Sequence, residues 1–325
     1  MHIPDGYLSP ATCGAFYAAM LPAWYMAFRK PRKDGEDAFL KAPLVALGAA
    51  FSFVIMMFNF PLPGATSAHV AGTAILAIML GPWPAVAAVS IALLLQAVVF
   101  ADGGITTYGV NAFNIALVMA VISAHVFGLL SGGRGSVRMS AIAAFIAAYL
   151  ASSVSAFLTA MELGVQPILS VSDAGVPLYA PYPLKVTLTA VMAPHLLIVA
   201  PAEGLMTALV VALLMKKGTF VDITDALMVK RNRLVSAIIV LAVFTPLGLI
   251  AKDAAWGEWS IAEIEARLGY VPEGIRRWGE FWSGVIPDYT VSGSMPVVEY
   301  IASAVFGSMA IVLLMYVVER FRRKR

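Results

Sequence analysis

The sequence predicts an all-α polytopic membrane protein, and three observations lead to this fold class. Hydrophobic residues make up 60% of the 325-residue chain and charged residues only 13%, whereas soluble domains are near half apolar and about a quarter charged. The mean hydropathy is +0.85. Apolar runs of roughly 16 to 30 residues recur along the whole chain, and such runs cross a bilayer as helices because a helix satisfies its own backbone hydrogen bonds.

Nine apolar spans are predicted, so the two ends of the chain should lie on opposite sides of the membrane. The spans cover residues 10–28, 42–60, 66–81, 84–101, 105–131, 138–161, 185–215, 233–251 and 296–318. Five basic clusters fall on one side and contain 17 of the 22 Lys and Arg residues. They consist of Arg29, Lys30, Arg32, Lys33 and Lys41; Arg134 and Arg138; Lys216 and Lys217; Lys230, Arg231 and Arg233; and Arg320, Arg322, Arg323, Lys324 and Arg325. The positive-inside rule makes that side cytoplasmic. We therefore expect a multi-pass protein of the cell inner (plasma) membrane with an extracytoplasmic N-terminus and a cytoplasmic C-terminus.

The residues before the first span form a tail on the external side. No Lys or Arg precedes residue 29, and secretory leaders place such charges before their apolar stretch, so we expect Met1 to be the mature N-terminus. The turns after Phe60 and at 101–104 and the loops at 162–184 and 252–295 lie on the same side. The single cysteine, Cys13, excludes an internal disulfide and a thiolate cluster, and we expect it to pack in the first helix.

The tail, MHIPDGYLSP, carries three nitrogens at the spacing of a metal chelate. The Met1 amine, the deprotonated His2 amide and His2 Nδ1 close a five-membered and a six-membered ring in one plane. Planar nitrogen sites suit Ni(II) and Cu(II), with low-spin Co(II) also open, and do not suit tetrahedral zinc. Pro4 has no amide hydrogen, so chelation stops before it, and Asp5 with Gly6 predicts a turn. Many chains begin Met-His without binding metal, so the tail needs a fourth donor on its own side of the membrane.

His69 is the candidate for that fourth donor. Pro61, Pro63 and Gly64 end the preceding helix, and Thr66 or Ser67 is expected to cap the short span 66–81, whose first turn would carry His69. Small residues dominate this span, which favours a place inside the bundle. A lone histidine here would more often hydrogen-bond at the membrane interface. With His2 on the same face, we favour a metal ligand.

Three polar residues are predicted near the outer turn at 101–104. Asn111 and Asn114 lie three apart on one helical face, and Gln96 precedes the turn. Such residues commonly form hydrogen bonds between helices. They would also be in place to orient a metal-loaded tail.

Three further polar residues fall deeper in the predicted spans. His125 is expected to hydrogen-bond to another helix, and His195 to a carbonyl freed by Pro194. Neither is an obvious partner for His2. Glu203 needs a partner or a proton inside the membrane, and the sequence assigns it no role.

The C-terminal third differs from the rest. Two spans, 233–251 and 296–318, flank the long external loop 252–295. Ser260 and Glu263 form a capping-box pattern ahead of a helix whose apolar face carries Ile261, Ile264 and Leu268. The loop is rich in aromatic residues that suit a membrane interface: Trp256, Trp259, Trp278, Phe281 and Trp282. A packed interfacial subdomain is the interpretation we prefer.

Several blocks of sequence carry a family resemblance. MHIPDGYLSP, PLPGATSAHVAG (61–72), LGPWPA (80–85) and LLLQAVVFADGGITTYGVNAFN (93–114) closely resemble the M component of cobalt/nickel energy-coupling-factor transporters (CbiM/NikM) over about residues 1–218. The two-span part with PDYTVSG is similar, more weakly, to their small N component (CbiN/NikN, PDGLE-like). The resemblance implies a metal-binding membrane domain at 1–218, a cytoplasmic linker at 219–232 and an N-component-like domain at 233–325.

The resemblance also implies a fold and a site. The fold is a seven-helix substrate-binding bundle into which the tail tucks, with two further transmembrane helices flanking the external loop. The metal ligands carried over are Met1, His2 and His69, and the transported substrate is Ni²⁺ or Co²⁺, with no organic cofactor. The implied partners are a transmembrane coupling subunit and a cytoplasmic ATPase subunit, within the lipid bilayer and without nucleic acid.

Two other classes of protein fit the sequence less well. The chain has no G-x-x-x-x-G-K-[ST] motif, so we expect a transport component that is not itself an enzyme, with any ATPase activity in a separate subunit. A stand-alone secondary carrier would often show internal repeats with paired broken helices, and none is convincing here. A serine hydrolase using Ser67 or Ser123 with His125 is disfavoured, because there is no G-x-S-x-G and Ser123 and His125 face different directions on a helix.

Overall fold

The protein is described by a computed structural model that covers residues 2–29, 42–62, 66–132, 136–216, 231–251, 256 and 259–322. The expected ligand Met1, most of the expected linker 219–232 and many of the basic residues lie outside these residues. The all-α prediction is confirmed, because the described chain is almost entirely helical and its strands form one small hairpin.

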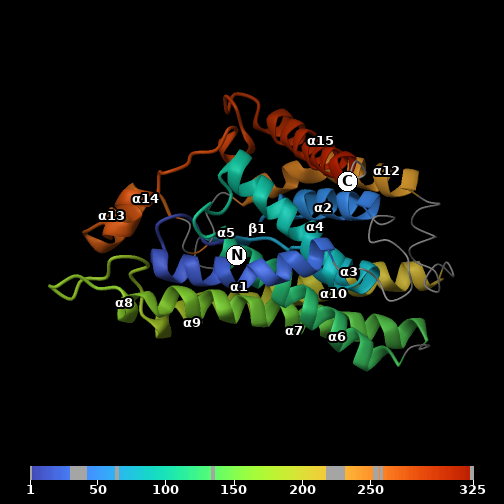
Figure 1. The fold of residues 1–325 in the computed structure, drawn as a ribbon, viewed down its shortest axis with the longest axis horizontal. Helices are drawn as coiled ribbons and strands as arrows, with labels where there is room; N and C mark the ends of the chain where they lie inside the picture. The colour runs from blue at the N-terminus through green and yellow to red at the C-terminus, as the bar shows by residue number, and fades with distance from the viewer. Residues whose placement is uncertain are drawn as a thin grey trace.

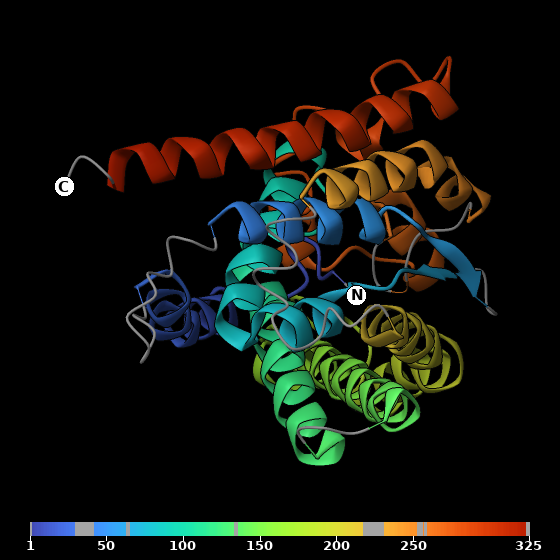
Figure 2. The same cartoon turned by 90° about the vertical axis from the view of Figure 1, so that its right-hand side faces the viewer.

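The first two thirds of the chain form a bundle in which most helices run side by side (Figure 1). Its α-helices are α1 (Pro10–Arg29), α2 (Ala42–Met56), α3 (Thr73–Leu80), α4 (Pro82–Leu95), α5 (Tyr108–Asn111), α6 (Met119–Ser131), α7 (Val137–Gly164), α8 (Gln166–Leu169), α9 (Leu184–Pro194) and α10 (Ala200–Lys216). Two strands, β1 (Phe60–Leu62) and β2 (Thr66–Ala68), pair antiparallel between α2 and α3. The tail ahead of α1 turns back into the middle of this bundle in both views (Figures 1 and 2).

Three π-helical segments interrupt these helices near the outer turn and the tail. They are η2 (Gln96–Phe100), η3 (Ala112–Val118) and η4 (His195–Val199). π-helical turns leave the regular hydrogen-bond ladder and occur often at functional sites. In this protein the π-helical segments carry polar side chains that are buried in the interior.

The C-terminal part adds α12 (Arg231–Phe244), η5 (Thr245–Ile250), α13 (Ile261–Leu268), α14 (Glu273–Trp278), η6 (Pro287–Tyr289) and α15 (Pro296–Arg322). In Figure 2, α15 crosses one side of the molecule, with α2 and α12 beneath it. The capping box of Ser260 and Glu263 is confirmed. Ile264 is buried, and Ile261 and Leu268 pack beside it against the tail residues Ile3, Tyr7 and Leu8.

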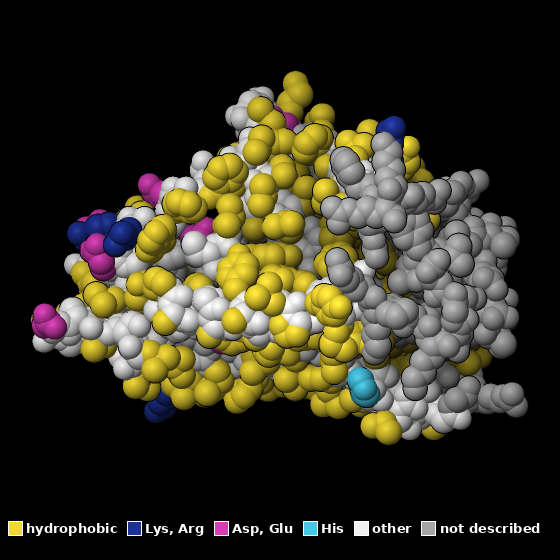
Figure 3. Space-filling view, in the orientation of Figure 1, with side chains coloured by type: hydrophobic (Ala, Val, Ile, Leu, Met, Phe, Trp, Pro, Cys, Tyr) yellow, Lys and Arg dark blue, Asp and Glu magenta, His cyan; other side chains and the backbone are white. Residues whose placement is uncertain are grey.

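Five continuous helices of the described chain are long and apolar enough to cross a membrane: Pro82–Phe100, Tyr108–Ser131, Val137–Leu169, Leu184–Lys216 and Pro296–Val318. Two shorter apolar helices, Pro43–Met56 and Val235–Ile250, match the predicted spans 42–60 and 233–251. The predicted span 10–28 corresponds to the 20-residue α1. Figure 3 agrees with this arrangement, because apolar side chains cover the middle of the visible face and several of the charged side chains that it colours lie at the end that carries α13 and α14.

The prediction of a helical span over 66–81 was wrong. Residues 66–68 form β2, and the helix begins only at Thr73, after Gly72 in a left-handed conformation (φ 69°). No side chain of the segment caps this helix. Glu203 of α10 does so instead, since its Oε2 accepts a hydrogen bond from the Ala71 N–H at 2.8 Å. This long-range contact gives Glu203 a role that the sequence did not indicate.

Candidate metal site

The tail is fixed by hydrogen bonds to its main chain. Asn111 pairs with both polar groups of Ile3, accepting from its N–H at 2.8 Å and donating to its carbonyl at 3.1 Å. The hydroxyl of Thr107 donates to the same carbonyl. Ile3 itself is 1% exposed. The residue that follows the predicted chelate is therefore held by hydrogen bonds, and Asn111 contacts the tail as predicted.

The predicted turn at Asp5 and Gly6 is present and ties the tail to the outer loop. Asp5 accepts hydrogen bonds from the Ile105 N–H at 3.1 Å and from the Thr106 N–H at 2.7 Å. Gly6 has φ 82°, and its Cα lies so close to α14 that a Cβ would meet the Gly274 carbonyl at 2.7 Å. Both conformation and space therefore require glycine there.

His2 is buried and held by a carboxylate. Its Nδ1 lies 2.5 Å from Asp102 Oδ1, and because a carboxylate only accepts, Nδ1 carries the proton. Burial opposes the charge of Asp102, but His2 and the hydrogen bonds around the carboxylate lower its pKa well below the usual range. Gln96 Nε2 donates to Asp102 Oδ2 at 3.0 Å. Gln96 thus reaches the tail through Asp102.

His69 lies directly beside His2. The two ring centroids are 4.9 Å apart, with an interplanar angle of 54°. His69 Nδ1 is 3.2 Å from the Val70 carbonyl, so Nδ1 carries the hydrogen and the lone pair lies on Nε2. Burial lowers the pKa of His69 well below its usual value, which keeps the ring neutral. A neutral imidazole whose other nitrogen is already bonded is a prepared metal ligand.

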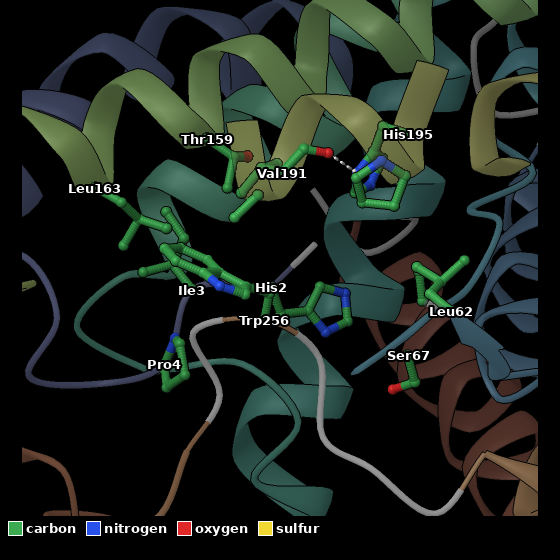
Figure 4. Close-up of a pocket in the computed structure, with 13 residues that line it drawn as sticks. His2, Ile3, Pro4, Leu62, Ser67, Thr159, Leu163, Val191, His195 and Trp256 are labelled. Carbon is green, nitrogen blue, oxygen red and sulfur yellow. Dashed lines mark hydrogen bonds between the residues drawn. The ribbon is translucent and has the colours of Figure 1, made fainter. Parts of the chain in front are cut away.

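A small cavity of about 30 Å³ opens between His2 and the membrane helices (Figure 4). Ser67, Thr159 and His195 contribute its polar groups. A space of this size holds about one or two water molecules. His195 Nδ1 lies 2.7 Å from the Val191 carbonyl of its own helix turn, so its Nε2 bears the lone pair, and Nε2 is buried without a partner among the described residues. His195, which sequence analysis set aside, therefore lines the same cavity as His2.

Two other predictions about polar residues were wrong. Asn114 bonds to Thr159 and Glu162 of α7 and does not contact the tail. It lies in η3, and a π-helical segment does not keep residues three apart on one face. His125 bonds to the carbonyl of Val121 in its own helix, at 2.7 Å, and is exposed. It therefore meets neither another helix nor Ser123.

The residue that sequence analysis missed is Asp102. Asp102 lies within the sequence block that carries the family resemblance, in a turn predicted on the same side as the tail. An acidic residue at that position could have indicated a contact with the tail. Across the described part of the chain, no group of three or more His, Cys, Asp or Glu side chains is arranged to hold a metal ion. The predicted chelate does not need such a group, because two of its four donors are a terminal amine and a main-chain nitrogen.

A family model described as the cobalt uptake substrate-specific transmembrane region (CbiM) matches residues 2–219. The chain belongs to the CbiM family. A second model, the PDGLE domain, matches residues 230–324. These matches confirm the resemblance that the sequence blocks indicated.

Known relatives cover nearly the whole chain. The fused nickel transport protein NikMN of Rhodobacter capsulatus is 44% identical over 96% of this chain and 95% of its own length. The probable fused nickel transport protein LarMN of Lactiplantibacillus plantarum is 37% identical over 97% of this chain and 96% of its own. A crystal structure of a truncated transition metal transporter, 40% identical, superposes with a TM-score of 0.61 and covers 67% of this chain and 99% of the solved one. Relatives thus match both the bundle and the C-terminal part.

Proposed function

We propose that this chain is the substrate-binding membrane component of an energy-coupling-factor importer for Ni²⁺ or Co²⁺, and that it captures the ion at the extracytoplasmic face. The observation that carries the proposal is the buried pair of His2 and His69, with ring centroids 4.9 Å apart. The names of the relatives, which specify nickel and cobalt transport, agree with a planar nitrogen site.

In the proposed site, four nitrogens bind the ion in one plane. They are the Met1 amine, the His2 amide nitrogen, His2 Nδ1 and His69 Nε2. The lone pair of His69 lies on Nε2, whereas His2 Nδ1 is bonded to Asp102. Binding therefore requires that Nδ1 leave Asp102 and give up its proton, and that the His2 amide lose its hydrogen. Affinity should rise with pH for this reason.

We propose a division of labour along the chain. Residues 1–218 bind the metal, 219–232 link the two parts on the cytoplasmic side, and 233–325 form the N-component-like domain. The N-terminus faces outward and the basic loops face the cytoplasm. Separate subunits, a transmembrane coupling protein and a cytoplasmic ATPase, would supply the energy, so the chain itself is not an enzyme.

The test uses the purified full-length protein loaded with Ni²⁺ and then dialysed. One added residue before Met1, His2→Ala and His69→Ala should each reduce bound nickel, measured by mass spectrometry, from near stoichiometric to near zero. His125→Ala is the matched control, because this histidine is exposed and bonds only within its helix. Stoichiometric metal in all three test variants would reject the proposal.

An uptake experiment distinguishes the proposed importer from the alternative, a stand-alone secondary carrier. Membranes that contain the chain with and without an ATPase subunit are compared for ⁶³Ni²⁺ uptake. Uptake that requires the ATPase supports the importer. Uptake driven by a proton gradient alone would favour the carrier.

A further inference from the structure

A side chain from the C-terminal part reaches the carboxylate that holds His2. The hydroxyl of Tyr289 donates a hydrogen bond to Asp102 Oδ2. Gln96 Nε2 lies 3.0 Å from both the Tyr289 hydroxyl and Asp102 Oδ2. The other oxygen of Asp102 meets His2 Nδ1. Four side chains from three parts of the sequence thus form one network, in which His2, Gln96 and Tyr289 are buried and Asp102 is partly exposed. Tyr289 is its member farthest along the chain.

Tyr289 is brought there by an unusual backbone. Asp288 and Tyr289 both lie in the left-handed region, with φ 51° and φ 61°. This conformation is unfavourable for a bulky residue and persists only where the surroundings enforce it. Here Ser303 of α15 donates to the Tyr289 carbonyl at 2.8 Å, and the Tyr289 ring stacks on Phe100 with centroids 4.6 Å apart. Strain held by specific contacts points to a role for the side chain it places.

The segment before Tyr289 is attached to the same turn that carries Asp102. The N–H groups of Val285 and Ile286 donate to the Val99 carbonyl at 2.7 and 2.8 Å. Trp282 Nε1 donates to the Val98 carbonyl at 2.8 Å. At Gly284, a Cβ would meet the Ala101 N at 2.9 Å, so only glycine lets the two chains approach so closely. These contacts use carbonyls of the π-helical segment η2, directly before Asp102.

We propose that Tyr289 is a positioning residue for the metal site, acting on His2 through Asp102. The inference rests on the function proposed above. With Tyr289 and Gln96 bonded to one oxygen, the Asp102 carboxylate stays in place. It holds the His2 ring beside His69 until the ion replaces Asp102 at Nδ1. Prior ordering of a ligand removes part of the entropy cost of binding. The C-terminal part thereby contributes to metal affinity without touching the metal.

The test compares two substitutions that each remove one hydroxyl from the purified full-length protein. Tyr289→Phe keeps the ring that packs on Phe100 and loses the hydroxyl that bonds to Asp102 and Gln96. Tyr300→Phe is the matched control, since its hydroxyl donates to the Met57 carbonyl at 3.1 Å, away from His2. Removing a group that orients a metal ligand typically weakens binding 10- to 100-fold. We expect Tyr289→Phe to weaken Ni²⁺ affinity about tenfold and to shift the visible absorption of planar nickel, with Tyr300→Phe unchanged in both.

A double-mutant cycle separates positioning from general damage. If Tyr289 acts through Asp102, then Tyr289→Phe should have little further effect on affinity in an Asp102→Asn background. Additive losses, or unchanged or tighter binding by Tyr289→Phe alone, would overturn the inference. Should Tyr289→Phe fail to fold, Ser303→Ala replaces it. It removes the bond to the strained Tyr289 carbonyl and should weaken affinity a few-fold, whereas wild-type affinity would overturn the inference.

The experiments distinguish failure of the role of Tyr289 from failure of the proposed function. If His2→Ala and the N-terminal extension retain stoichiometric nickel, the function fails. If they lose nickel while Tyr289→Phe binds as tightly as the unmodified chain, only the role of Tyr289 fails.

Discussion

The C-terminal part meets the rest of the chain in two very different ways. At the end of the molecule that carries α13 and α14, residues 259–289 bond to the tail and to η2 through defined contacts. The Tyr7 hydroxyl donates to the Trp259 carbonyl at 3.2 Å, and the Val285 N–H to the Val99 carbonyl at 2.7 Å. Along the membrane, α2, α12 and α15 enclose an open apolar groove of about 800 Å³. Hydrogen bonds that bear on the metal site are thus made by the loop, whereas an open groove remains between the three membrane helices.

This difference has a physical reason. Hydrogen bonds are directional and fix the two partners at one register. Apolar helix faces in a bilayer gain little by packing on each other, since lipid tails are equally apolar. Changes at the contacts made by residues 259–289 should therefore alter metal binding, and changes in the groove should not.

The largest effect is expected from Gly6→Ala. The positive φ of Gly6 and the contact of a Cβ with the Gly274 carbonyl together cost about 3 kcal/mol, which corresponds to roughly a hundredfold weaker Ni²⁺ binding if the docked tail is required. A chelator-competition titration measures this. Gly14→Ala is the control, because its Cβ would point into open space. Equal affinity of the two variants would show that the site does not depend on tail docking.

A smaller loss of Ni²⁺ affinity is expected from Asp5→Ala. The substitution leaves the N–H groups of Ile105 and Thr106 without their acceptor. An unsatisfied buried donor costs about 1–3 kcal/mol, and these two residues are half-buried, so water replaces part of the lost bonds. We expect about tenfold weaker Ni²⁺ binding in the same titration. Asp173→Ala, at an exposed position of an external loop, should bind normally, and a similar loss in both would point to a general charge effect.

A still smaller effect is expected at the capping box. Ser260→Ala removes the cap of α13 and destabilises this helix by about 1 kcal/mol. Hydrogen exchange in α13 should therefore be faster, and Ni²⁺ binding should weaken no more than a few-fold. Hydrogen bonds from Ser260 lower the pKa of Glu263, so the box stabilises α13 fully above the ordinary pKa of Glu and loses this contribution as pH falls through the lowered one. Hydrogen exchange in α13 is measured above the ordinary pKa of Glu and again below the lowered pKa of Glu263, with the exposed Glu265→Ala as control. Unchanged exchange in Ser260→Ala would contradict this prediction.

The smallest effect is expected in the groove. Leu313 of α15 is 63% exposed and lines the groove, whereas Ile311, two residues earlier, is fully buried. Leu313→Ala should change the free energy of unfolding by no more than about 0.5 kcal/mol, and Ile311→Ala should lower it by about 2–5 kcal/mol. Thermal unfolding in lipid nanodiscs measures both. A large loss for Leu313→Ala would mean that the groove is closed by packing.

The accuracy of the sequence-based predictions varied with the range of the interactions involved. The long apolar runs, the turn at Asp5 and Gly6 and the capping box of α13 depend on residues close together in the chain, and all three are confirmed. The helix start near Thr66 was wrong because Glu203, 132 residues away from Ala71, caps the chain there instead. Asn114 was misplaced because a π-helical segment changed the spacing of the face.

By itself, the sequence determined the membrane fold class and the family, since composition and motif order are local properties, and its nitrogen spacing led to the chelate that we propose. Only the tertiary structure decided which groups surround His2. Asp102, Gln96 and Tyr289 lie 100, 94 and 287 residues from it along the chain, and Asp102 contacts it through a hydrogen bond. Such bonds depend on distance and angle in space, which neither hydropathy nor spacing along the sequence encodes.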